Sequence, residues 1–183
     1  MWLKSPMSEV KPATVPLLRP KAGGSISAVI TGEPLRCFVH YCSGRSWPCT
    51  DHKCTLCKRG ITRRFYAYYP CRGVTNNAGI LELTAQTDAA LISQMEPVTQ
   101  IPKGQIKISR AGGKRNNPCQ IIWREEEGPE YRGDASLNER ELMEALMRIW
   151  NLPARNGEIE ESEYLEKLNE AIRLKTTPTS KHS

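Results

Sequence analysis

Five short runs of alternating hydrophobic and polar residues predict five β-strands in the middle of the chain. A strand that buries one face carries an apolar side chain at every second position. The first run is interrupted by the turn at Gly32-Glu33-Pro34. The runs are Ser25–Thr31 continued by Leu35–Tyr41, then Arg63–Tyr69, Ile80–Thr84, Gln105–Arg110 and Cys119–Arg124.

One short helix is predicted between the third and fourth strands, at Thr87–Met95, with Thr87 as its N-cap. Three strands, a helix and two further strands follow the order of the OB-fold, a five-stranded Greek-key barrel that often binds oligonucleotides. We therefore expect a mainly β protein with an OB-like barrel at residues 25–124, and a generic small antiparallel barrel is the alternative. The segment between the first two strands would be an inserted loop.

The N-terminal residues and the segment after the last strand lack such periodicity. Residues 1–24 contain four prolines and the pair Gly23-Gly24, which favours a flexible arm. Residues 125–135 begin with three glutamates followed by Gly128-Pro129, which is typical of a linker.

The C-terminal part has helical periodicity at residues 136–175. Ser136 is the predicted N-cap of a first helix, with Glu139 at the capping-box position. A second amphipathic run covers Ile159–Leu174, so a helical hairpin is expected, followed by a tail at residues 176–183. Such a hairpin either packs on the barrel or binds a partner.

The net charge of +6 hides an asymmetry along the chain. Residues 1–124 hold 18 Lys/Arg and 6 Asp/Glu, a net +12, whereas residues 125–183 hold 8 and 14, a net −6. This distribution favours a body that binds a polyanion and a C-terminal region that contacts a protein partner through acidic helices. Removing residues 125–183 is then expected to leave nucleic-acid binding intact or stronger.

Four residues match the ligands of a structural zinc ion (Zn²⁺). They form the pattern H-x8-C-x4-C-x2-C with His40, Cys49, Cys54 and Cys57. Two thiolates three residues apart can hold one ion from a single turn. His40 is preferred as the fourth ligand because it would approach from the opposite side of the ion, while His52 and Cys42 stay open as alternatives.

Other features of the sequence argue for an intracellular, non-enzymatic protein. Seven cysteines, several of them in one loop, favour thiolate ligation in a reducing compartment over a disulfide framework. No apolar run approaches the roughly 18 residues that span a bilayer, so no membrane association is expected and a cytoplasmic location is predicted. Nucleotide-binding and nucleophile motifs are missing, and four strong ligands favour a closed zinc site.

The second strand is rich in aromatic and basic residues that alternate between its faces. Arg64, Tyr66 and Tyr68 share one face, whose polar tips predict exposure and base stacking. An aromatic ladder on the barrel surface is the alternative. Cations of the last two strands and their connecting loop would contact phosphates. The predicted nucleic-acid-binding residues are Arg64, Tyr66, Tyr68, Lys107, Arg110, Lys114 and Arg115.

The ligand order within this strand pattern resembles the zinc-containing single-stranded DNA-binding protein of T-even phages, over roughly residues 25–124. The resemblance implies an OB-fold with a basic aromatic groove, zinc at the four named residues and an acidic C-terminal region for protein contacts. We therefore expect a protein that binds single-stranded DNA, with RNA as a further possible ligand. A zinc-stabilised protein–protein adaptor in a nucleic-acid-processing complex is the alternative.

Overall fold

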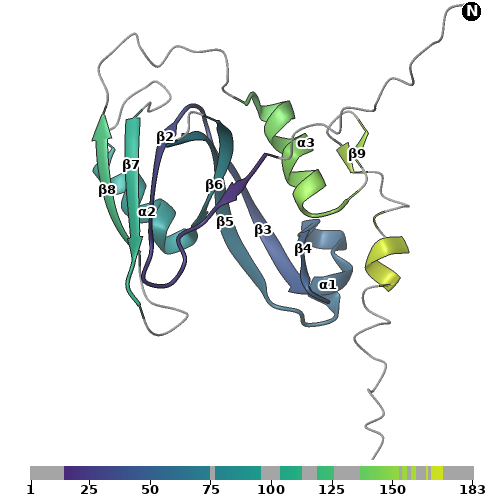
Figure 1. The fold of residues 1–183 in the computed structure, drawn as a ribbon. Helices are drawn as coiled ribbons and strands as arrows, with labels where there is room; N and C mark the ends of the chain where they lie inside the picture. The colour runs from purple at the N-terminus through teal and green to yellow at the C-terminus, as the bar shows by residue number, and fades with distance from the viewer. Residues whose placement is uncertain are drawn as a thin grey trace, which may run out of the picture.

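The computed structural model describes residues 15–74, 77–95, 104–112, 119–125, 137–152, 154–155, 158–159, 164 and 166–170. The protein is mainly β, with one strongly curved eight-stranded sheet and a few helices (Figure 1). The strands of this sheet are β1 (Leu17–Leu18), β2 (Ser25–Ile30), β3 (Leu35–Cys42), β4 (Arg45–Pro48), β5 (Arg63–Gly73), β6 (Ala78–Thr84), β7 (Gly104–Arg110) and β8 (Cys119–Glu125). The helices are the 3₁₀ turn η1 (Asp51–Lys53), α1 (Thr55–Lys58), α2 (Ala85–Gln94) and α3 (Glu139–Ile149), and a small hairpin joins β9 (Ala154–Arg155) to β10 (Glu158–Ile159).

The five predicted strand runs form the continuous part of the sheet, in the order β6-β5-β2-β7-β8. The interrupted first run becomes two strands, β2 and β3, which both pair antiparallel with the long strand β5. Strand β4 pairs only with β3 and was not predicted. Leu17 and Leu18, which were placed in the flexible arm, pair in parallel with Ile80 and Leu81 of β6.

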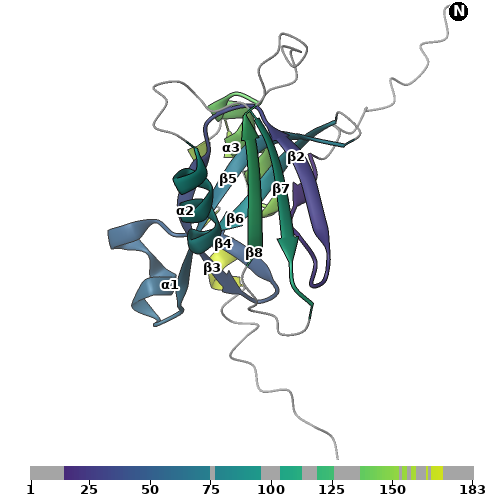
Figure 2. The same ribbon diagram turned by 90° about the vertical axis from the view of Figure 1, so that its left-hand side faces the viewer.

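The sheet does not close into a barrel by strand pairing, so the predicted OB-like barrel is not confirmed. Helix α2 lies in the gap instead, where it contacts β8 as well as β5 and β6 (Figure 2). The Gln94 side chain donates to the Ile121 carbonyl at 3.1 Å and accepts from the Trp123 N–H at 3.0 Å. Because these bonds satisfy groups on the free edge of β8, that edge does not need a neighbouring strand there.

Helix α2 begins three residues earlier than predicted. Its N-cap is Thr84, whose hydroxyl oxygen accepts from the Thr87 N–H, so Thr87 is inside the first turn. Asp88 anchors the helix: it is 2.9 Å from Arg36 Nε and accepts a 2.6 Å hydrogen bond from the Tyr69 hydroxyl. The helix is therefore fixed to both β3 and β5.

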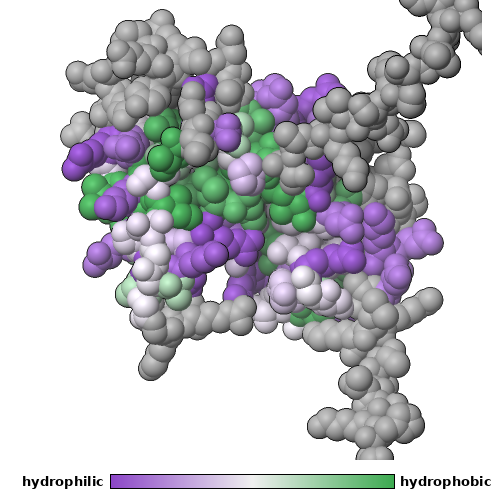
Figure 3. Space-filling view, in the orientation of Figure 1, coloured by the Kyte–Doolittle hydropathy of each residue, from purple (hydrophilic) through white to green (hydrophobic). Residues whose placement is uncertain are grey.

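Two hydrophobic clusters lie on opposite faces of the sheet, and β5 contributes to both. Ala67 and Tyr69 pack in the cluster beneath α2, together with Leu91 and Ile108. Tyr68 packs in the other cluster, which fills the space between the sheet, the α1 loop and α3. In Figure 3, hydrophobic side chains gather across the sheet and hydrophilic ones lie below them, over β4 and α1.

The C-terminal segment belongs to this second cluster. Helix α3 begins at Asn138, whose side chain forms a capping box with Glu141, two residues after the predicted cap at Ser136. Tyr164 and Leu168 are also buried there, and the Tyr164 hydroxyl donates to the Pro48 carbonyl at 3.0 Å. Strand β10 ends at Ile159, the first residue of the predicted second helical run, and residues 164 and 166–170 of that run are helical.

Among the described residues, none of the helices is both long and apolar enough to cross a membrane.

The pairing of β7 with β8 leaves no room for a side chain at Gly104. A Cβ at this position would lie 2.5 Å from Cζ2 of Trp123 and 2.6 Å from the Arg124 carbonyl oxygen. We expect Gly104→Ala to lower the free energy of unfolding by about 1–3 kcal/mol, because overpacking forces the strand to shift. Gly73→Ala is the control, since nothing lies within 4 Å of its new Cβ. Urea midpoints that are equal for the two variants would contradict this packing.

Candidate metal centre and arginine-lined cleft

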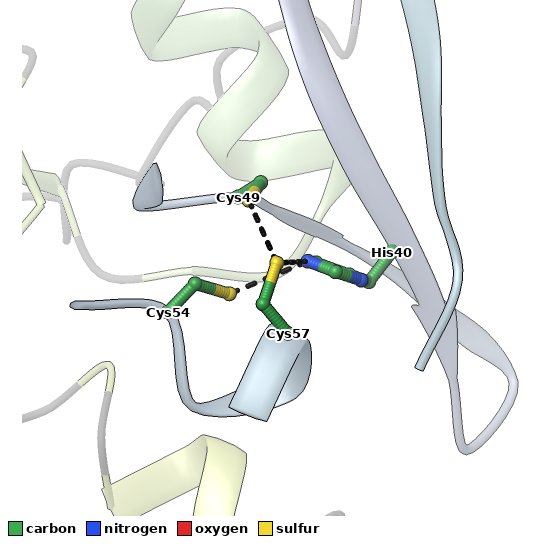
Figure 4. A group of neighbouring side chains, drawn as sticks. All are labelled: His40, Cys49, Cys54 and Cys57. Carbon is green, nitrogen blue, oxygen red and sulfur yellow. Dashed lines mark hydrogen bonds between the residues drawn. The ribbon is translucent and has the colours of Figure 1, made fainter. Parts of the chain in front are cut away.

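The four predicted metal ligands come from a hairpin and the short helix after it (Figure 4). His40 lies on β3 and Cys49 directly follows β4, where its N–H donates to the Phe38 carbonyl at 2.8 Å and extends the hairpin. Cys54 is the N-cap of α1 and Cys57 lies within it, so one tight turn presents both thiols. The loop therefore brings ligands from two sides to one point.

The distances between the ligand atoms match a tetrahedral site. His40 Nε2 is 3.3 Å from Cys54 Sγ and 3.5 Å from Cys57 Sγ, and the Sγ atoms of Cys49 and Cys57 are 3.6 Å apart. All four atoms lie within 4.8 Å of one another. Zinc bonded to three sulfurs and one nitrogen at ordinary bond lengths has ligand–ligand edges of roughly 3.5–3.8 Å. The cluster could therefore hold a metal ion, and its dimensions suit zinc.

His40 is held in the form that a metal requires. It is fully buried, and its Nδ1–H donates to the Ile61 carbonyl at 2.9 Å. Because Nδ1 carries the proton, the lone pair of Nε2 points toward the sulfurs, as in many metal-bound histidines. His52 is exposed and Cys42 is buried in the hydrophobic cluster, and neither joins the group. The structure thus places His40, and neither of these two alternatives, beside the three thiols.

The surroundings of Cys54 favour loss of its thiol proton, whereas those of Cys57 oppose it. Burial opposes ionisation of Cys54, but hydrogen bonds from the backbone N–H groups of Cys57, Thr50 and Leu56 outweigh it and lower the pKa of this thiol to about 6. Burial and the neighbouring sulfurs raise the pKa of Cys57 to about 11. Cys54 thus loses its proton more readily than Cys57, and metal binding would release the protons that the bound thiols still carry.

Arg63 connects the metal ligands to an exposed aromatic pair. Its guanidinium is 3.8 Å from Cys49 Sγ and 3.4 Å from Asp51 Oδ1, and it lies 4.3 Å above the ring of Phe38. Phe38 in turn contacts Phe65 edge to face. A cation beside three thiolates offsets the negative charge that they would carry around a divalent ion.

The predicted nucleic-acid-binding residues divide into four groups. Tyr68 is 1% exposed and packs against Trp150, so its predicted exposure is wrong. Lys107 is exposed, but it points to the opposite side of β7 from Ile106 and Ile108, which enter the core. Lys114 and Arg115 lie outside the described residues.

The remaining three, Arg64, Tyr66 and Arg110, line one cleft of about 590 Å³. Arg19 from the β1–β2 connection and Phe65 of β5 lie in the same cleft. The first residues of α2 form another wall, and Leu83 and Ile108 add apolar surface. Three arginines, two aromatic residues and the N-terminal end of α2 therefore border one space. This combination attracts anions and aromatic groups.

One carboxylate, Glu82, also lines this cleft. Its Oε1 is 3.4 Å from Arg19 Nε, and its side chain is 13% exposed. Burial raises the pKa of Glu82, whereas Arg19 and a hydrogen bond from Tyr68 lower it.

Three further residues line the cleft and were not predicted from the sequence: Arg19, Phe65 and Glu82. Arg19 was assigned to the flexible arm, although the apolar pair Leu17-Leu18 before it was a signal that the chain is already ordered there. Phe65 was placed on the face of β5 opposite Arg64, and its ring contacts Phe38 edge to face, but both Phe65 and Arg64 border the cleft near the beginning of the strand.

Comparison of the chain with protein-family models, with curated proteins and with solved structures finds no match. The chemistry of the His/Cys cluster and of the arginine-lined cleft is therefore inferred from the geometry of this protein alone.

Proposed function

We propose that the protein binds single-stranded nucleic acid, in the first place DNA, in the arginine-lined cleft, and that a structural zinc ion stabilises the adjoining loop. One observation carries the proposal: Arg19, Arg64 and Arg110 share a cleft with Phe65 and Tyr66. Guanidinium groups pair with phosphates, and bases stack on aromatic rings at about 1–3 kcal/mol each. The net +12 of residues 1–124 supports a polyanionic ligand.

The size of the cleft agrees with a ligand that is unpaired. A volume of about 590 Å³ lies in the range of roughly 300–1,000 Å³ that encloses a small organic molecule. A single unstacked nucleotide fits such a space, whereas a base inside a duplex is stacked and paired. We therefore expect binding to single strands to be stronger than binding to duplexes of the same sequence.

The metal is assigned a structural role. Four ligands, one histidine and three cysteines, leave no position for a substrate on a tetrahedral ion. The ion would join the β3–β4 hairpin to α1 and position the start of β5, where Arg64 and Phe65 enter the cleft. A binding protein, not an enzyme, is the function that these features support.

The OB-like arrangement and the resemblance to the zinc-containing phage protein are part of the same proposal. Support comes from the strand order β6-β5-β2-β7-β8, in which the third, second, first, fourth and fifth predicted strands follow one another. Oligonucleotides bind OB-folds on the second and third strands and on the loops after the first and fourth. The cleft lies at the corresponding ends of β5, β6, β7 and β8.

Replacing a cleft arginine should change the salt dependence of binding. We expect Arg110→Gln to weaken binding of a labelled single-stranded oligonucleotide and to reduce the slope of log K against log salt by about 0.7, since one phosphate contact is lost. Lys107→Gln is the matched control, because Lys107 lies on the same strand but points away from the core side. Affinities would be measured by fluorescence anisotropy at several salt concentrations.

Two results would contradict the proposal. The parent protein binding no oligonucleotide, or binding with no salt dependence, would favour the protein–protein adaptor. Equal salt slopes for the parent and Arg110→Gln would remove the cleft from the binding site.

A further inference from the structure

Glu82 is the unexpected member of the cleft. A carboxylate repels phosphate, so its presence among three arginines weakens any binding that depends on phosphate alone. Its side chain is 13% exposed, and its ion pair with Arg19 is long at 3.4 Å, with an arginine that is 61% exposed. Such a pair contributes little to stability. Glu82 also accepts a hydrogen bond from the hydroxyl of the buried Tyr68, and together these two partners use only part of its acceptor capacity.

The register of the sheet places Glu82 beside the stacking surface. Tyr66 pairs with Thr84 and Tyr68 pairs with Glu82 across β5 and β6, so Tyr66 and Glu82 are diagonal neighbours on the same face. Diagonal neighbours lie about 7–8 Å apart, which is within reach of long side chains. A base that stacks on Tyr66 would thus present one of its edges to the Glu82 carboxylate.

An ionised carboxylate has two oxygens that only accept hydrogen bonds, with about four acceptor sites in total. Arg19 and Tyr68 occupy part of this capacity. Guanine offers two adjacent donors, N1–H and N2–H, on one edge, which matches two carboxylate oxygens. Adenine and cytosine place an amino donor beside an acceptor nitrogen, and thymine places one N–H between two carbonyl oxygens, so each of them brings an acceptor toward the carboxylate.

We propose that Glu82 makes the cleft selective for guanine, by accepting hydrogen bonds from the N1–H and N2–H edge of a base stacked on Tyr66. The inference rests on the proposed function, since it assigns a base preference to the same cleft. The arginines then supply sequence-independent affinity, and Glu82 supplies the selection. A bidentate pair of this kind contributes about 1–3 kcal/mol of discrimination, or roughly 5- to 150-fold in affinity.

The test compares short thymidine oligonucleotides that differ at one central position. We expect the parent protein to bind the strand with a central guanine about tenfold more tightly than the all-thymidine strand. Inosine is the matched ligand, because it keeps N1–H and lacks the N2 amino group, and it should lose most of the gain. Glu82→Gln should remove the preference for guanine, and it should bind the all-thymidine strand more tightly than the parent because a negative charge is lost from the cleft.

Arg19→Gln serves as a second variant, because it leaves the carboxylate in place and removes one cation. It should weaken binding of every strand and retain the preference for guanine. Each variant is used only after its melting temperature and metal content match those of the parent. If the parent binds all strands in a salt-dependent manner but equally, or if Glu82→Gln keeps the preference, the inference is wrong and the proposed function stands. Absence of any binding by the parent would contradict the proposed function itself.

Discussion

Cys54→Ser is expected to lose stoichiometric zinc and to melt at least about 10–20 °C below the parent protein. Zinc bound at structural sites contributes roughly 10–16 kcal/mol in small zinc domains, and loss of a ligand forfeits several kcal/mol of this. In a chain of this size each kcal/mol shifts the melting temperature by about 2–4 °C. Cys54 is also buried at 1% exposure, so a serine would leave a buried hydroxyl in place of a thiolate.

Metal content would be measured by elemental analysis and stability by thermal denaturation. Cys119→Ser is the control, since Cys119 lies on β8 and outside the ligand cluster. The parent protein should also melt earlier after treatment with a zinc chelator. A Cys54→Ser variant that keeps the metal stoichiometry and melting temperature of the parent would show that the four residues do not bind an ion.

The two histidines of the loop region allow a sharper comparison. His40→Gln removes a fully buried ligand that is held by the Ile61 carbonyl, whereas His52→Gln changes an exposed side chain two residues before Cys54. We expect zinc loss and destabilisation from the first change and neither effect from the second. Equal effects of the two changes would mean that His40 is buried for packing and not for ligation.

Removal of residues 137–183 is expected to prevent stable folding. This segment supplies eight buried residues of the hydrophobic cluster between the sheet, the α1 loop and α3: Leu142, Ala145, Leu146, Met147, Trp150, Leu152, Tyr164 and Leu168. Without them Trp47 and Tyr68, which are 0% and 1% exposed, would face water. This packing therefore argues against the expectation that the acidic C-terminal region can be deleted without loss of nucleic-acid binding.

Point variants in this region distinguish the contribution of apolar packing to stability from that of negative charge. Leu146→Ala should lower the free energy of unfolding by about 2–5 kcal/mol, because it creates a cavity at a position with 0% exposure. Glu166→Gln with Glu170→Gln removes two exposed negative charges from the same region and should leave stability within about 0.5 kcal/mol. Urea denaturation would measure both. A truncated chain that folds, binds zinc and melts like the full chain would contradict the assigned role of the segment.

The metal centre was predictable from local spacing because most of its geometry is local. Cys54 and Cys57 lie in one turn, and a turn of four residues fixes their distance regardless of the rest of the fold. Cys49 and His40 join them through the β3–β4 hairpin, which is also a contact between near neighbours in the chain. The argument that a fourth ligand would come from the other side therefore pointed to His40, the residue that lies beside the three thiols.

The exposure of the face proposed to bind nucleic acid was harder to predict, because alternation separates the two faces of a strand without telling which one is covered. The sequence correctly grouped Arg64, Tyr66 and Tyr68 on one face of β5, and polar tips favoured exposure. Helix α3 buries part of this face, with Tyr68 packing against Trp150, more than 80 residues later in the chain. A contact at that separation leaves no trace in the local pattern of β5.

The sequence by itself indicated the His/Cys cluster and the longer strands, though not β1 or β4, because these features depend on residue type, spacing and period. The tertiary structure alone decided that the sheet stays open, since Gln94 of α2 binds the edge of β8 in place of a strand. It also decided that Arg19, Arg64 and Arg110 share one cleft with Glu82. Those side chains come from segments far apart in sequence, and only the curvature of the sheet and the position of α2 bring them together.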